Sequence, residues 1–358
     1  MRPLLAAVFA LGLGADLSAA PPPRVTNARV EKRSGGSGLL PLVKAELAAR
    51  SGPFWLGWSV AATERSSSCC WSGDDRGGTS CRGCSLEGER RFEVQGGSDE
   101  AVTLEGSDRI RVLLRVEGGR VGKIRMFSED CPVDAAGMPL VWVEDVRPAD
   151  SVALLASYVG QPRDEGRGGK RLDDGAVAAI ASHADPSADA ALERFVAPEQ
   201  PLELRKQAAF WMGNARGARG YEALRRLVKD DADRRLREHA VFALTQSREP
   251  KAVDTIIEVA HRDADAQVRG QALFWLAQSA ARRAPAAIQA AIDDDPEVEV
   301  KKKAVFALSQ LPKDEGVPLL IKVAQTHRSY EVRKQAMFWL GQSQDARALA
   351  FFEDVLKR

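Results

Sequence analysis

The sequence is poor in the residues and motifs from which most active sites are built. Only four histidines occur in 358 residues, and they fall at unrelated positions. A Gly-rich phosphate loop, a Gly-x-Ser-x-Gly elbow and a His-Glu-x-x-His pair are all missing. We therefore expect a protein that is not an enzyme and that binds no cofactor or metal.

Strong net charge is missing too, and so is an apolar run that could span a bilayer. The net charge of +1 gives no bulk attraction to nucleic acid or to an acidic membrane. The apolar run from Leu4 to Leu13 is too short to span a membrane. With Arg2 before it and Ser18-Ala19-Ala20 after it, the run predicts a signal peptide at residues 1–20. We expect an exported protein, periplasmic or extracellular; because Pro21 suits a cleavage site badly, an uncleaved anchor is the alternative.

What the sequence does contain is a repeat. Close copies of Gln207-Ala208-Ala209-Phe210-Trp211-Met212-Gly213 return every 32 residues to the end of the chain. The residue after each Phe alternates between Trp and Ala, so a period of 64 residues is laid over the first. A fixed period of roughly 20 to 50 residues predicts a solenoid of stacked units.

Each unit is expected to hold two helices. A second apolar column, out of phase with the Phe column, predicts the other helix of the unit; it consists of Leu192, Leu224, Ile256, Ile288, Leu320 and Phe352. Between the helices lies an acidic turn, placed to cap the Phe-bearing helix, with Asp231, Asp263 and Asp295 in successive units. A basic column stands five residues before each Phe: Arg205, Arg237, Arg269, Lys301 and Arg333.

This pattern resembles the HEAT repeat, in the short bacterial form also seen in the phycobilisome-lyase HEAT-like family. The resemblance covers roughly residues 172–358, with a degenerate first copy that has Ala in place of Phe and Trp. It implies an all-α solenoid whose second helices line a concave surface. Some HEAT proteins, the deoxyhypusine hydroxylases, carry paired His-Glu motifs for iron. This chain has no His-Glu pair, so that activity does not carry over.

The first half of the chain has a different sequence pattern. Short apolar runs bounded by turn residues predict strands at 55–61, 92–95, 102–104, 110–116, 121–127 and 140–146. Glu117-Gly118-Gly119-Arg120 separates two of these runs, and a Gly-Gly centre favours a tight hairpin turn. We expect a small, mostly antiparallel β domain.

This domain holds all the cysteines, namely Cys69, Cys70, Cys81, Cys84 and Cys131. In an exported protein, disulfides are the first expectation. A zinc site is the second, since Cys81-x-x-Cys84 is a usable half-site but Cys69-Cys70 is not another. A thiol oxidoreductase comes only third, since the sequence shows no strand-to-helix transition that would activate an attacking thiol. The odd number leaves one cysteine free or paired to another chain.

The Phe column falls outside the packed face of its helix. Turning about 100° per residue from Leu204 places Ala208, Trp211 and Met212 on the packed side and Phe210 outside it. We expect the Phe column and the flanking amides to form a partner-binding stripe: Phe210, Phe242, Phe274, Phe306, Phe338, Gln207, Asn214, Gln246, Gln271, Gln278, Gln310, Gln335 and Gln342. The alternative is that each Phe fills the seam between repeats. The Trp/Ala column is expected to be core, a large residue meeting a small one.

Together these features predict an α+β chain of two domains. The expected parts are a signal peptide at 1–20, a Pro/Gly-rich leader at 21–37, a Cys-containing β-rich domain at 38–146, a helix and hinge linker at 147–171, and an all-α HEAT solenoid at 172–358. The expected function is that of an exported, non-enzymatic adaptor or scaffold whose solenoid binds a protein or peptide and no nucleic acid. The alternative is a thiol-redox or metal-binding activity centred on the Cys69–Cys84 loop.

Overall fold

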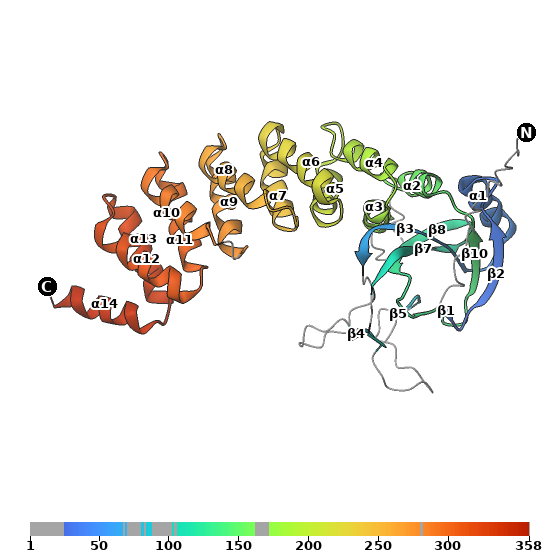
Figure 1. Cartoon of the computed structure of the whole chain (residues 1–358), viewed down its shortest axis with the longest axis horizontal. Coiled ribbons are helices and arrows are strands. Elements are labelled where there is room, and N and C mark those ends of the chain that lie inside the picture. Colours follow the sequence, from blue (N-terminus) through green and yellow to red (C-terminus); the bar gives the residue numbers. More distant parts are fainter. Residues whose placement is uncertain are drawn as a thin grey trace, which may run out of the picture.

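The computed structural model describes residues 25–66, 69, 80–81, 84–87, 102–103, 106–161, 172–279 and 282–357. The expected signal peptide and the strand expected at 92–95 lie outside these residues. In Figure 1 the helices form an arch that joins a β domain at its N-terminal end. Among the described helices, none has the length and apolar character needed to cross a membrane.

The β domain is built on a five-stranded sheet in the order β2-β10-β3-β7-β8. Its strands are β2 (Arg29–Ser34), β3 (Phe54–Ser66), β7 (Ser107–Glu117), β8 (Arg120–Ser128) and β10 (Pro139–Glu144). The expected hairpin joins β7 to β8. Gly118 and Gly119 both have positive φ, which a two-residue turn of type I′ requires.

The antiparallel pairing expected for this domain holds for β3, β7 and β8, whereas β10 pairs parallel with both β2 and β3. The start of the domain differs from the expectation. Residues assigned to the leader form β1 (Val25–Thr26) and β2, so the domain begins earlier than expected. Helix α1 (Leu39–Ala49) carries the chain from β2 over to β3, so these two strands run in the same direction. β2 was missed because it reads Arg-Val-Glu-Lys-Arg-Ser, a charged sequence that suits a sheet edge.

Successive side chains along each strand point to opposite faces of the sheet, and each face packs against an apolar cluster. Phe54, Leu56 and Trp58 face a core that includes α1 and α2 (Pro148–Ala156). Trp55 faces a second apolar cluster that contains Cys84 and Cys131. The short strands β5 (Cys84–Ser85) and β9 (Val133–Asp134) contribute residues to this cluster. Two further short strands, β4 (Ser80–Cys81) and β6 (Val102–Thr103), pair with each other.

The rest of the described chain is helical. The helices are α3 (Leu172–Ser182), α4 (Ser187–Phe195), α5 (Leu202–Ala215), α6 (Gly217–Asp230), α7 (Arg234–Thr245), α8 (Ala252–Arg262), α9 (Ala266–Gln278), α10 (Ala284–Asp294), α11 (Val298–Ser309), α12 (Lys313–Thr326), α13 (Tyr330–Gln342) and α14 (Ala346–Leu356). The Phe-bearing helices α5, α7, α9, α11 and α13 pack closely on one another, whereas the other row is more loosely spaced. The closer row of a curved stack lies on its inner side, so these helices form the concave face, which lies below in Figure 1.

An ion-pair ladder joins successive repeats. Arg269 donates from Nη1 to the carbonyl of Asp263 in its own turn, at 2.9 Å. Its Nε and Nη2 donate to the carboxylate of Asp295 in the next turn, at 2.8 and 3.1 Å. One repeat earlier Arg237 makes the same bridge to Asp263, at 3.0 and 3.1 Å. Each aspartate is therefore held between two repeats, and these hydrogen bonds raise the pKa of Arg269.

The acidic turn caps α7 and α9, but through Asp233 and Asp265 rather than through the expected Asp231 and Asp263. The N-cap of α9 is Asp265, whose side chain accepts from the backbone N–H of Gln267. Asp263, two residues earlier, accepts from the backbone N–H of Asp265 at 2.8 Å and thereby shapes the turn. The expectation placed the acid correctly between the helices but missed its partner, the arginine of the preceding repeat.

The sheet and the solenoid share one hydrophobic core. Helix α3, the degenerate first repeat, lies on β8 so closely that a Cβ on Gly175 would sit 2.5 Å from the carbonyl oxygen of Ile124. The end of β3 adds a backbone hydrogen bond from Ala184 to Ala61, at 2.9 Å. These contacts differ from the hinge expected between the domains, because a hinge separates two cores and here the core is continuous.

Candidate functional site

A ladder of aromatic rings runs along the Phe-bearing helices. Phe210 stacks on Phe242 with ring centroids 6.0 Å apart, and Phe242 lies 4.7 Å from Trp275 of the next repeat. The pattern then begins again, with Phe274 stacked on Phe306 at 6.0 Å and Phe306 at 4.9 Å from a further tryptophan, Trp339. We call these eight residues the aromatic ladder: Phe210, Trp211, Phe242, Phe274, Trp275, Phe306, Phe338 and Trp339.

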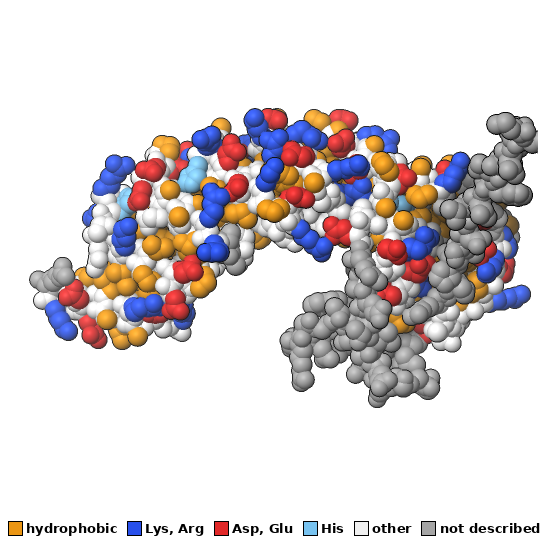
Figure 2. All heavy atoms as spheres, in the orientation of Figure 1, with side chains coloured by type: hydrophobic (Ala, Val, Ile, Leu, Met, Phe, Trp, Pro, Cys, Tyr) orange, Lys and Arg blue, Asp and Glu red, His pale blue; other side chains and the backbone are white. Residues whose placement is uncertain are grey.

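The rings of the ladder remain partly exposed. The first four Phe residues are half-buried and Phe338 is 54% exposed, whereas neighbours such as Leu273 and Leu276 are fully buried. Figure 2 shows hydrophobic side chains along the lower, inner side of the arch, while charged ones crowd its upper side. The Phe residues therefore do both things considered from the sequence: they contact the next repeat, and they present ring surface to the concave face.

The tryptophans are not the core residues that we expected. Trp211, Trp275 and Trp339 are half-buried, whereas Ala243 and Ala307 at the same repeat position are fully buried. Each Trp lies at 5.0 to 5.4 Å from the Phe before it in an edge-on arrangement. The sequence did carry a signal for this, because the Trp column directly follows the Phe column and so lies at the margin of the packed arc.

The predicted amides flank the ladder. On one side lie the half-buried Gln207, Gln271 and Gln335. On the other, at the C-terminal ends of the same helices, lie Asn214, Gln246, Gln278, Gln310 and Gln342, all at least partly exposed. The stripe predicted from helical phase is thus the solvent-facing side of these helices, with aromatic rings in the middle and uncharged hydrogen-bonding groups along both edges.

Two polar atoms beside the ladder lack a hydrogen-bond partner among the described residues. They are Nε2 of His239 and Nε1 of Trp339. His239 lies edge-on to Phe242 at 5.7 Å, and burial, followed by the charge of Lys206, lowers its pKa. A buried polar atom left unpaired costs about 1–3 kcal/mol.

The chain itself supplies one extended segment that already lies on the solenoid. The end of β3 pairs with the turn between α3 and α4 through an antiparallel bridge between Ala62 and His183. Two residues further along, Glu64 forms an ion pair with Arg248, in the turn between α7 and α8. No feature of the sequence pointed to this contact, because nothing in a strand pattern names a partner 184 residues away.

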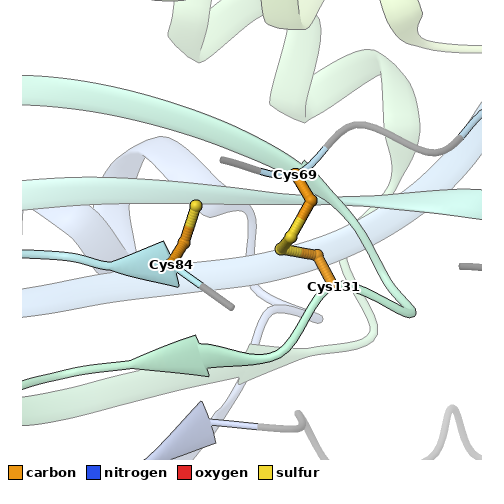
Figure 3. A group of neighbouring side chains, drawn as sticks. All are labelled: Cys69, Cys84 and Cys131. Atoms are coloured by element: carbon orange, nitrogen blue, oxygen red, sulfur yellow. A yellow bond between two sulfur atoms is a disulfide. The ribbon is translucent and has the colours of Figure 1, made fainter. Parts of the chain in front are cut away.

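The cysteines lie on the far face of the sheet. Cys69 and Cys131 form a disulfide, and the sulfur atoms of Cys69, Cys84 and Cys131 all lie within 4.8 Å of one another (Figure 3). Cys84 is disulfide-bonded as well. The side chains of Cys70 and Cys81 lie outside the described residues. Among those described, the three sulfurs are the single group that could hold a metal ion. Zinc binds thiolates rather than disulfides, so this alternative first requires reduction.

A serine and a histidine also meet inside the protein. Ser151 Oγ lies 2.8 Å from His183 Nε2 and accepts a hydrogen bond from Trp58 Nε1 at 2.7 Å. His183 Nδ1 lies 2.6 Å from the carbonyl of Ala179, so Nδ1 carries the proton and Nε2 accepts from the serine. Burial lowers the pKa of His183 to about 4. Because Ser151 and His183 are both fully buried, no substrate reaches them and the pair serves the junction.

Comparison with known proteins assigns the solenoid. The family model of HEAT repeats matches residues 188–277 and 284–358. The C-terminal part of the chain is therefore a HEAT-repeat solenoid, as the sequence pattern indicated. No curated protein matches the sequence.

Several solved structures are similar. Human deoxyhypusine hydroxylase in complex with glycerol is 17% identical, with 55% of this chain and 76% of that chain covered and a TM-score of 0.30. The complex of CpcE and CpcF of phycocyanin lyase from Nostoc sp. PCC7120 is 21% identical, with coverages of 43% and 99% and a TM-score of 0.32. Kap121p bound to Ste12p is 16% identical, with coverages of 59% and 25% and a TM-score of 0.31. Similarities this low do not bear on what this chain binds.

Proposed function

We propose that the protein is an exported, non-enzymatic adaptor whose HEAT solenoid binds an extended segment of a partner protein along the aromatic ladder. The observation that carries the proposal is the ladder itself, since half-buried rings continue across five helices of the concave face. Aromatic side chains are the residues that most often anchor a protein–protein interface.

The surroundings of the ladder favour a polypeptide as its ligand. The amides along both edges, among them Gln271 and Gln278, can donate to and accept from a peptide backbone at every repeat. The end of β3 gives a precedent within the chain, because an extended segment there hydrogen-bonds to an inter-repeat turn at Ala184. A ligand that is long and regular fits a site that is long and regular.

The proposal of an adaptor rather than an enzyme rests on the chemistry available near the ladder. Among the described residues no group of His, Asp and Glu side chains converges there. The Ser151–His183 pair is enclosed, and its histidine is already committed to Ala179. Binding is the function that the exposed groups can perform.

The test compares two substitutions on adjacent residues of α9. The full mature chain is immobilised and incubated with a periplasmic extract, and captured proteins are quantified by mass spectrometry. We expect Phe274→Ala to lose at least tenfold in the capture of the dominant partner while unfolding at nearly the wild-type temperature. Leu273→Ala is the control; it removes a fully buried side chain, which typically costs about 2–5 kcal/mol.

Two results would overturn the proposal. One is unchanged capture by Phe274→Ala and by Trp275→Ala. The other is a stability loss in Phe274→Ala as large as that in Leu273→Ala, because it would make the Phe column a structural seam.

Export is the second part of the proposal. The charged, apolar and small-residue regions of residues 1–20 support it, and so does the Cys69–Cys131 disulfide, since such bonds persist in oxidising compartments. Fractionation followed by N-terminal sequencing tests it. We expect a mature N-terminus near Pro21 in the periplasmic or extracellular fraction, and a cytoplasmic protein that retains Met1 would refute it.

A further inference from the structure

A cavity lies at the C-terminal end of the aromatic ladder. It occupies about 180 Å³ between α11, α12 and α13, and Trp339 forms part of its lining. Leu308, Leu311, Val317 and Leu320 line it with apolar surface. Since an engineered cavity of roughly 150 Å³ holds benzene, this space can take one branched aliphatic side chain or one ring. Trp339 also contacts Phe306, so one residue belongs both to the aromatic ladder and to the lining of the cavity.

The HEAT periodicity identifies the matching place four repeats of 32 residues earlier, and there the space is filled. Arg216 donates from Nη1 to the carbonyls of Ala181 and His183. Its Nε donates to the carboxylate of Asp189 at 2.7 Å. The three residues that hold this guanidinium stand at the repeat positions of Ser309, Leu311 and Val317, all of which line the cavity.

The C-terminal cavity lacks such an internal guest. The residue at the repeat position of Arg216 is Gln344, which is shorter and exposed. Gly316 lets α12 approach α11 closely at this place, because a Cβ there would lie 2.4 Å from the carbonyl oxygen of Leu308. The same architectural position is therefore occupied by the chain itself at one end of the solenoid and available at the other.

The chemistry of the two places is opposite. At the N-terminal place Asp185 and Asp189 are acidic, and the guest is a cation. At the C-terminal place Lys313 replaces the first acid and Val317 the second. Lys313 lines the cavity and is exposed, so it disfavours a cation and favours a carboxylate nearby.

From this contrast we infer that the cavity is an anchor pocket for one apolar side chain of an extended peptide, with a carboxylate of the same peptide beside Lys313. The inference rests on the proposed function and adds the chemistry of the segment that is bound: an apolar residue next to an acidic one, or an apolar residue at a free C-terminus. Rows of exposed amides along α5 to α13 would hold the rest of the peptide.

Fluorescein-labelled heptapeptides with a Gly/Ser background test this on the full mature chain by fluorescence anisotropy. One peptide carries Glu-Leu at its centre, the second Lys-Leu, the third Glu-Ala, and the fourth ends in Leu with a free carboxylate. We expect the Glu-Leu or the free-Leu peptide to bind about ten- to a hundredfold more tightly than the Glu-Ala peptide, since one buried aliphatic group contributes that much. The Lys-Leu peptide should also bind more weakly, because its lysine is repelled by Lys313. Whichever of the Glu-Leu and free-Leu peptides binds more tightly identifies the source of the carboxylate.

Two matched pairs of variants locate the binding. Ser343→Leu fills the cavity, whereas Ser279→Leu makes the same change two repeats earlier; both serines donate to a carbonyl of their own helix, at 2.7 and 2.8 Å. Lys313→Glu reverses the charge at the cavity, and Lys322→Glu does so elsewhere on α12. We expect only Ser343→Leu and Lys313→Glu to weaken binding at least tenfold.

The outcomes separate this inference from the proposed function. One outcome is that the peptides bind, that Phe274→Ala abolishes this binding, and that Ser343→Leu has no effect on it. In that case the aromatic ladder is the binding site and the pocket assignment is wrong. Equal affinity for all four peptides would also overturn the pocket assignment. If periplasmic partners are captured through the ladder but no heptapeptide binds, the adaptor function stands and this recognition chemistry falls.

Discussion

Lys301 and His327 donate to the same backbone carbonyl, that of Ile292. Lys301 Nζ lies 2.7 Å from this oxygen and His327 Nε2 lies 3.2 Å from it. One repeat earlier the same two positions are held by Arg269 and Asp295, which form an ion pair. Both members of the pair have changed together, from opposite charges to a lysine and a histidine that cannot attract each other. The last link of the ion-pair ladder is thus made through a shared carbonyl rather than through a salt bridge.

The buried bond of Arg269 to Asp295 should contribute far more than its exposed bond to Glu297. Asp295→Asn leaves the buried guanidinium of Arg269 without its charge partner, and we expect it to lower the free energy of unfolding by about 3 kcal/mol. Glu297→Gln is the control, since Glu297 contacts the same arginine at 3.1 Å but is 53% exposed, so its loss should cost less than about 1 kcal/mol. Urea unfolding followed by circular dichroism measures both losses of stability. Equal losses would mean that burial does not determine the strength of the bonds in the ion-pair ladder.

Packing of α3 on the sheet gives a second prediction. Gly175→Ala forces a Cβ toward the carbonyl of Ile124, and overpacking of this kind costs about 1–3 kcal/mol. Gly341→Ala is the matched helical control; with no atom within 4 Å of its new Cβ, it should stabilise the protein by about 0.5–1 kcal/mol. Thermal unfolding of the two variants should move in opposite directions. A neutral Gly175→Ala would show that α3 can shift away from the sheet.

The shared core also predicts what happens when the connection is cut. A protease site inserted between residues 162 and 171 should be cleavable while the two fragments stay together in size-exclusion chromatography, because the core from β3 to α5 crosses the cut. Residues 172–358 produced alone should expose the apolar sheet-facing side of α3 and aggregate. Two cleaved fragments that separate and each melt cooperatively would restore the hinge expected from the sequence.

The sequence predicted the parts of the fold that are local and periodic. Helix pairs, the order of the repeats, the partly exposed Phe stripe and the hairpin at Gly118-Gly119 all follow from spacing along the chain. It failed where the partner is remote: β10 inserts between β2 and β3 without any signal, and Arg269 binds an acid of the next repeat. The tryptophan column shows a third limit, because helical phase gives a direction but not the distance to the neighbouring repeat that decides burial.

His183 makes stability depend on pH between about 4 and 6.5. Its pKa is about 4 in the folded protein and 6.5 as an ordinary histidine, so the unfolded chain binds more protons in this window. Stability is therefore retained above pH 6.5 and is lost as the pH falls, by up to about 3 kcal/mol below pH 4. Arg216, which bonds to the carbonyl of His183, adds repulsion against the protonated ring, while Asp185 opposes it.

Urea unfolding at pH 7, 5.5 and 4.5 measures this dependence. His183→Gln should lower the stability at pH 7 but flatten the slope between pH 7 and 4.5. His261→Gln is the control, because it makes the same chemical change at an exposed position away from the junction. An unaltered slope in His183→Gln would assign the pH dependence to other groups.

Because of its disulfide, the stability of the protein should depend on whether it folds in an oxidising or a reducing compartment. Cys69 and Cys131 are 62 residues apart in sequence, and closing a loop of that size stabilises a protein by up to about 4 kcal/mol. Cys131 is fully buried beside Trp55 and Trp142 in the second core of the sheet, so a thiol there is shielded once the domain has folded. We expect the double variant Cys69→Ala/Cys131→Ala to unfold at a lower urea concentration. Dithiothreitol should shift the wild type at least as far, because it also reduces the disulfide of Cys84. Peptide mapping without reduction, applied to exported protein, should recover the Cys69 and Cys131 peptides as one linked species; two separate alkylated peptides would rule out the pairing, and with it this support for export.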